Sequence, residues 1–89
     1  MFNKKIWENR KVLVTGHTGF KGSWLSFWIS QFGAKVTGYA LDPLTDPNLY
    51  SLLDIQKRII DHRDDIRDFS TLERVIKSAK PEIIVHMAA

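Results

Sequence analysis

Residues 11–22 read KVLVTGHTGFKG, an apolar run followed by glycines at fixed spacing. The apolar run closes at Gly16 and is typical of a strand buried on both faces. Residues 15–22 then follow the pattern T-G-x-x-G-x-x-G at the start of an amphipathic helix. Gly16 permits a tight turn, Gly19 lets a pyrophosphate approach the backbone, and Gly22 lets the helix pack closely. The stretch predicts a dinucleotide-binding loop, and the alternative is a turn whose glycines only begin a helix.

The start of this helix is a predicted anion site. A helix N-terminus presents unpaired N–H groups and a positive dipole, and we expect those of Gly19, Phe20 and Lys21 to meet the phosphates. We also expect the ammonium of Lys21, or the side chain of His17, to add a phosphate contact. The predicted cofactor-binding loop therefore comprises Gly16, His17, Thr18, Gly19, Phe20, Lys21 and Gly22.

Strand and helix patterns alternate along the rest of the chain. Apolar residues recur every three or four positions in residues 19–32, which predicts a helix that stops at Gly33. The later segments predict a strand over 34–41, a short helix over 48–53 capped by Asp46-Pro47, a weaker strand over 58–62, a helix capped by Ser70 or Asp68 that ends at Pro81, and a strand over 82–86. The order β-α-β-(α)-β-α-β predicts an α/β fold, a Rossmann-type doubly wound parallel sheet with its ligand at the carboxyl ends of the strands.

Asp42 is the predicted ribose-binding residue. It ends the second predicted strand, where a carboxylate can accept hydrogen bonds from the adenosine ribose and repel a 2′-phosphate, which favours NAD over NADP. Neither Pro43 nor Leu44 supplies the cation that an NADP site needs, and the nearest following bases, Lys57 and Arg58, lie beyond the predicted short helix. The alternative is a turn aspartate before proline.

Composition limits the class of protein. A length of 89 residues allows at most one domain, and 44% hydrophobic with 26% charged residues is ordinary for a globular fold. The chain has no cysteine, no signal-peptide pattern and no apolar run of membrane-spanning length, so we expect a cytoplasmic protein without a membrane partner. The net charge of +3 is scattered, which argues against nucleic acid, and the three histidines lack metal-ligand spacing. The acidic run of residues 61–68, interleaved with Arg63 and Arg67, is typical of a solvated loop.

The motif TGHTGFKG, together with residues 65–68 (DIRD) and 86–89 (HMAA), resembles the extended short-chain dehydrogenase/reductase family, whose members modify nucleotide sugars. Residues 16–25, 38–43 and 48–50 are similar to its 4,6-dehydratases. The resemblance implies bound NAD, a nucleotide-sugar substrate and CDP-glucose as the expected one. It also implies that Asp65 and Ile66 hold the adenine and that Ala88 and Ala89 lie against the ribose and pyrophosphate. The alternatives are another dehydratase or epimerase of the family, or an NAD(P)-binding sensor without turnover.

The catalytic residues of that family are missing from these 89 residues. The family uses a Tyr-x-x-x-Lys pair, whereas the residues four positions after Tyr39 and Tyr50 are Pro43 and Asp54. We therefore expect the N-terminal part of an NAD-binding Rossmann domain, inactive as a dehydratase by itself and with its last strand as an open edge. Trp24, Phe27 and Trp28 of the predicted first helix are typical of core residues, or of an interface if the helix is more apolar than the sheet can cover. The second interpretation predicts a homodimer.

Overall fold

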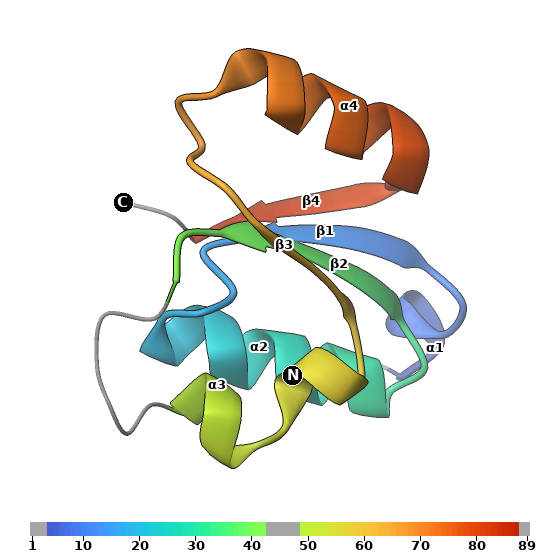
Figure 1. Ribbon diagram of the computed structural model, residues 1–89. Helices are drawn as coiled ribbons and strands as arrows, with labels where there is room; N and C mark the ends of the chain where they lie inside the picture. The colour runs from blue at the N-terminus through green and yellow to red at the C-terminus, as the bar shows by residue number, and fades with distance from the viewer. Residues whose placement is uncertain (1–3, 43–48, 88–89) are drawn as a thin grey trace.

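The computed structural model describes residues 4–42 and 49–87 (Figure 1). Its elements are α1 (Lys4–Trp7), β1 (Lys11–Thr15), α2 (Phe20–Gln31), β2 (Lys35–Ala40), α3 (Leu49–Leu52), a 3-10 turn (Ile55–Lys57), β3 (Ile60–Arg63), α4 (Phe69–Ala79) and β4 (Ile83–His86). The predicted alternation of strands and helices is confirmed, whereas α1 and the 3-10 turn are not predicted by the sequence patterns. No helix within the described ranges is long and apolar enough to cross a membrane.

The four strands form one parallel sheet in the order β3-β2-β1-β4. Figure 1 shows α2 and α3 on one face of the sheet and α4 on the other. The central strand β1 is buried on both faces, as its apolar run predicts: Val12 and Val14 pack in the cluster that includes Ile29 of α2, whereas Leu13 packs with Val75 of α4. The predicted Rossmann-type α/β fold is thus confirmed, and the carboxyl ends of all four strands meet at one edge of the sheet.

Several element boundaries differ by one or two residues from the predicted ones, and local contacts explain the start of β3 and the cap of α4. The predicted strand over 58–62 starts two residues later, because Arg58 closes the preceding 3-10 turn by donating its N–H to the Ile55 carbonyl at 2.8 Å. Helix α4 is capped by Asp68 rather than Ser70, since Asp68 accepts from the Thr71 N–H at 3.2 Å. The predicted Asp46-Pro47 cap lies outside the described residues.

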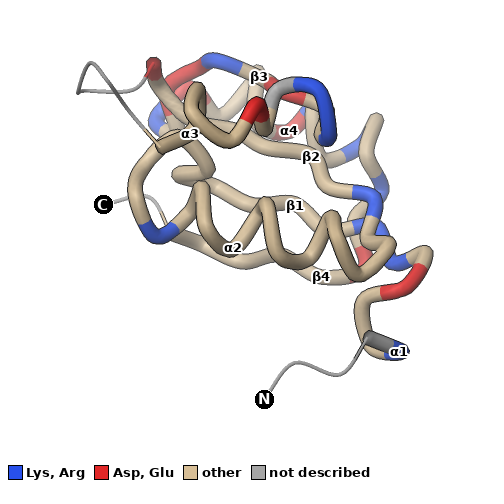
Figure 2. Tube along the Cα trace, turned by 90° about the horizontal axis from the view of Figure 1, so that it is seen from below, with Lys and Arg blue, Asp and Glu red and all other residues tan. Residues whose placement is uncertain are grey.

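The edge strand β4 and the outer side of α2 expose apolar surface. Strand β4 pairs with β1 alone among the described strands, and its Ile84 is 55% exposed. Phe20, Trp24 and Trp28 lie one helical turn apart along α2 and are all exposed. Figure 2 shows that α2 carries charge only at its beginning, where Lys21 lies. The open edge is as expected, and the homodimer stays a prediction.

Gly22 holds the first turn of α2 against the loop that follows β1. A Cβ atom at Gly22 would lie 2.0 Å from the carbonyl oxygen of Gly16 and 3.0 Å from the Cα of His17. A Cβ at Gly19 would meet nothing nearer than the same oxygen at 3.6 Å, which is ordinary contact. The close approach therefore requires glycine at position 22 and allows alanine at position 19.

We predict that Gly22→Ala lowers the free energy of unfolding of the protein by more than about 2 kcal/mol, because the methyl group overlaps backbone that cannot move aside. Gly19→Ala is the matched control and should change it by less than about 0.5 kcal/mol, since Gly19 has φ −76° and ψ 171°, which alanine adopts. Both variants restrict the unfolded chain similarly, so their difference isolates the contact. Denaturant unfolding measures both, and equal losses would contradict the prediction.

Candidate functional site

The glycine loop leaves backbone donors open at the carboxyl edge of the sheet. Gly16 takes a positive φ of 81°, as the predicted tight turn requires. Its carbonyl accepts the Gly19 N–H at 3.2 Å, so this N–H is used inside the loop, contrary to expectation. The N–H groups of Phe20 and Lys21 have no acceptor among the described residues. The exposed open donors therefore include those of Phe20 and Lys21, beside the exposed Gly19.

Side-chain hydrogen bonds fasten this loop to its surroundings. The buried Ser23 hydroxyl donates to the His17 carbonyl at 2.9 Å. The Thr18 hydroxyl donates to the Leu41 carbonyl at 2.8 Å, which ties the loop to the end of β2. Where β1 and β4 end, Thr15 Oγ1 and His86 Nδ1 are joined by a 2.7 Å hydrogen bond. These bonds fix the shape of the loop before any ligand arrives.

The imidazole of His17 is buried beneath the loop instead of facing a phosphate. Its ring is 0% exposed, lies against Gly38 of β2 and meets the Tyr50 ring edge-on at 5.4 Å between centroids. Its Nε2 lies 2.5 Å from Asp61 Oδ1, whereas its Nδ1 has no partner within residues 4–42 and 49–87. Burial lowers the pKa of His17 despite the nearby Asp61 carboxylate, so the neutral ring donates from Nε2.

The predicted phosphate contact of the His17 side chain is therefore corrected. A fully buried ring that hydrogen-bonds to Asp61 of β3 cannot reach a ligand at the surface. His17 stays a predicted cofactor-binding residue through its backbone alone. The side chain of Lys21 is exposed, and its contact with a phosphate stays a prediction.

Asp42 lies where the sequence places it, but a cation lies beside it. Its side chain is 82% exposed, and its Oδ1 accepts from Arg63 Nη1 at 2.8 Å. Arg63 ends β3 next to the end of β2, where it pairs in register with Ala40. The expectation that no base lies near Asp42 is thus wrong, because the parallel sheet joins positions 21 residues apart in the chain. Pro43 and Leu44 lie outside the described residues.

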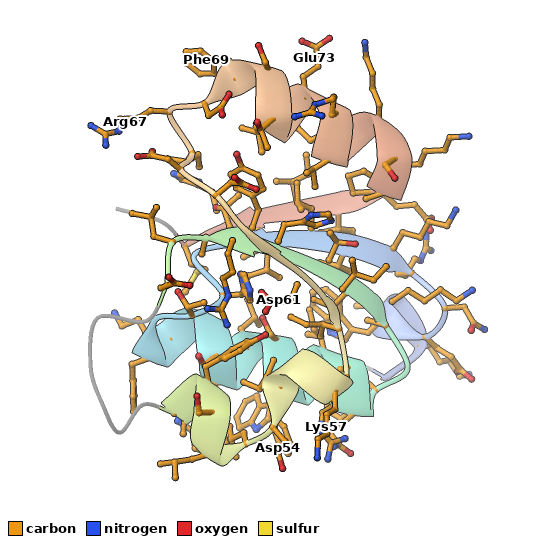
Figure 3. The ribbon with its side chains drawn as sticks, viewed as in Figure 1. Asp54, Lys57, Asp61, Arg67, Phe69 and Glu73 are labelled. Atoms are coloured by element: carbon orange, nitrogen blue, oxygen red, sulfur yellow. The ribbon has the colours of Figure 1, made fainter. Side chains whose placement is uncertain are left out.

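Asp61 and Arg63 are the site residues that sequence reasoning missed. The sequence places both in an acidic run typical of a solvated loop, and Asp61 also in the predicted strand over 58–62. In the structure both lie in β3, and Figure 3 shows Asp61 pointing toward the face that α2 and α3 cover. Desolvation raises the pKa of Asp61, but hydrogen bonds from His17 and Arg63 outweigh it, so the net pKa is lowered and the carboxylate is charged. The available signal was the spacing of two, which puts both residues on one face of a strand.

The predicted adenine-binding segment is held by internal bonds. The Asp65 carbonyl accepts from the Tyr39 hydroxyl at 2.9 Å. Hydrogen bonds from Arg67 hold the pKa of the Asp65 carboxyl at about 2, and Figure 3 shows Arg67 projecting from the loop before α4. Ile66 is half-buried against the cluster that contains Leu13. The adenine role of Asp65 and Ile66 stays a prediction, and Ala88 and Ala89 lie outside the described residues.

These residues fit a dinucleotide with a pyrophosphate. Around Gly19 the space beyond the backbone is open, the donors of Phe20 and Lys21 border it, and Asp42 stands at the end of β2. Neither described tyrosine is followed by lysine four positions later, and both rings are buried. The described residues can therefore bind and orient a cofactor, but they do not form the family's acid–base pair.

Known proteins with similar sequences agree with this description. A family model described as GDP-mannose 4,6 dehydratase matches residues 13–89. The CDP-glucose 4,6-dehydratase of Salmonella typhimurium is 51% identical over all 89 residues, 100% of this chain and 25% of that protein. The chain thus spans about a quarter of the length of this curated relative.

Solved structures also match. An epimerase from Methanothermobacter thermautotrophicus superposes with a TM-score of 0.78 at 30% identity, over 97% of this chain and 24% of that one. The dTDP-glucose 4,6-dehydratase of Bacillus anthracis, solved in complex with NAD, gives a TM-score of 0.71 at 31% identity, over 88% and 26% of the two chains. Since the family model covers most of the sequence and the Salmonella relative matches all of it, the chain belongs to the GDP-mannose 4,6 dehydratase family, within the extended short-chain dehydrogenases/reductases.

Proposed function

We propose that this chain is the NAD-binding part of a nucleotide-sugar 4,6-dehydratase that acts on CDP-glucose. The observation that carries the proposal is the open backbone cradle at the start of α2, where Phe20 and Lys21 present unpaired N–H groups beside an exposed glycine. The choice of substrate is supported by the 51% identity to a protein named CDP-glucose 4,6-dehydratase. NAD is supported by the similar dTDP-glucose 4,6-dehydratase solved with that cofactor.

The residues of this chain bind and orient. The N–H groups of Phe20 and Lys21 hold the pyrophosphate, Asp42 accepts from the adenosine ribose, and the segment of Asp65 and Ile66 borders the adenine. Ala88 and Ala89 complete the set as residues beside the ribose and pyrophosphate. NAD, when bound, would accept a hydride from the sugar and return it. The catalytic acid and base come from residues outside this chain segment. The protein that contains it is a cytoplasmic homodimer.

A second candidate is an epimerase or another dehydratase of the same family. It is favoured by the structural match to an epimerase, because these proteins share the cofactor-binding fold and differ in the residues that act on the sugar. The non-enzymatic candidate is a sensor that binds NAD(P) without turnover. Turnover separates the sensor from the enzymes, and the sugar product separates a dehydratase from an epimerase.

We predict that the protein containing this chain converts CDP-glucose to a 4-keto-6-deoxy product that absorbs in alkali, and that residues 1–89 alone do not. UDP-glucose and dTDP-glucose, offered at the same concentration, are the controls for the nucleotide base. Formation of an epimerised sugar without the keto product would favour the second candidate. Binding of NAD without any turnover would favour the sensor.

We predict that the protein binds NAD at least about tenfold more tightly than NADP, equivalent to roughly 1.4 kcal/mol. Asp42→Ala should narrow this preference, because it removes the acceptor for the ribose hydroxyls and the charge that repels a 2′-phosphate. Glu82→Ala is the control, since it removes an exposed carboxylate that pairs with Arg10 at 2.9 Å, at the opposite edge of the sheet. Calorimetry at one ionic strength measures both affinities, and equal effects of the two substitutions would make Asp42 a turn residue only.

A further inference from the structure

Arg63 is the cation nearest to the predicted ribose site, and it is held from two sides. Its Nε donates to Asp61 Oδ1 at 3.0 Å, and its guanidinium carbon lies 4.9 Å from the centroid of the Tyr50 ring. The Arg63 side chain is 31% exposed, whereas that of Asp42 is 82% exposed. A guanidinium held by a carboxylate and an aromatic face therefore presents its remaining edge to an exposed carboxylate.

Asp61 connects this arginine to the glycine loop. One oxygen, Oδ1, accepts from both His17 Nε2 at 2.5 Å and Arg63 Nε at 3.0 Å. His17 is held in turn by Gly38, where an added Cβ would lie 2.4 Å from the imidazole ring. The chain of contacts His17–Asp61–Arg63–Asp42 thus runs from beneath the pyrophosphate loop to the carboxylate at the end of β2.

The charges of these four contacting side chains determine how strongly the ribose pocket repels a 2′-phosphate. His17 is neutral, so one guanidinium faces two carboxylates, those of Asp61 and Asp42. The Arg63 bond engages Oδ1 of Asp42 and leaves Oδ2 without a partner among the described residues, free to accept from a ribose hydroxyl. Two of the five N–H donors of the guanidinium are used by Asp61 and Asp42, which leaves donors for a phosphate oxygen.

We propose that Arg63 is a specificity-determining residue of the adenosine ribose pocket: it positions Asp42 for the ribose hydroxyls and partly neutralises it, so that a 2′-phosphate is rejected less strongly than by a lone aspartate. The proposal rests on the NAD-binding function proposed above. An arginine near this position is the usual means by which dinucleotide-binding sheets accept a 2′-phosphate. Here it comes from β3 instead of the loop after β2. NAD remains the preferred cofactor, and Arg63 limits the size of the preference.

The test compares dissociation constants for NAD and NADP in the unmodified protein, Arg63→Met, Arg63→Lys and Arg10→Met. Arg63→Met should raise the ratio of the NADP constant to the NAD constant about tenfold, since two carboxylates then face the 2′-phosphate without a cation. Arg63→Lys keeps the charge and should retain most of the original ratio. Arg10→Met is the matched control, because it also removes an arginine from an ion pair, that with Glu82, and should leave the ratio unchanged.

The outcomes distinguish this proposal from the one on which it rests. If Arg63→Met changes both constants by the same factor, Arg63 has no part in specificity, although NAD binding by the unmodified protein would still support the proposed function. Failure of the unmodified protein to bind NAD overturns both.

If Arg63→Met does not fold, the test uses the unmodified protein. The affinities for 2′,5′-ADP and for ADP are then measured as a function of salt concentration. A steeper loss of 2′,5′-ADP affinity with added salt supports a cation at the 2′ position, and equal slopes overturn it.

Discussion

The approach of α2 to the Gly16 carbonyl is the contact on which the rest of the site depends. With no side chain at Gly22, the first turn of the helix lies directly against the turn that leaves β1. This closeness brings the unpaired N–H groups of Phe20 and Lys21 to the carboxyl edge of the sheet. A bulkier residue would move the helix start outward and displace the donors from the proposed pyrophosphate site.

Beneath the loop, a buried polar pair replaces the apolar packing that most of the sheet uses. A histidine with no exposed surface is stable there because its ring is neutral and its Nε2 has a carboxylate acceptor. Gly38 of the second strand leaves room for the ring, which also bonds to Asp61 of the third strand. The His17 ring therefore links the glycine loop to both strands. The same Asp61 oxygen also orients Arg63, which extends this link to the surface. Loop geometry and the charge at the proposed ribose pocket therefore share one partly buried carboxylate.

The neighbouring charged groups differ in what they can do because they differ in burial. The Asp65–Arg67 pair lies within one loop, and its arginine is 86% exposed, so solvent screens it and its effect is mainly to shape the loop. Arg63 is less exposed, stacks on Tyr50 and joins two strands. Its charge therefore acts at a fixed place. This contrast separates a local turn contact from a group that can influence a ligand.

The sequence by itself determined the alternation of strands and helices, the glycine loop and the position of Asp42, because each rests on local chemistry. Periodicity marks a buried strand or an amphipathic helix within ten or so residues, and glycine spacing marks the turn between them. The sequence also offered both Ser70 and Asp68 as the N-cap of one helix. In the structure Asp68 is the cap, because its side chain accepts from the Thr71 N–H. Only the tertiary structure could show that the His17 ring is buried and that Arg63 stands beside Asp42. Those contacts join residues 44 and 21 positions apart, and they arise from strand register, which the local pattern of a single chain does not specify.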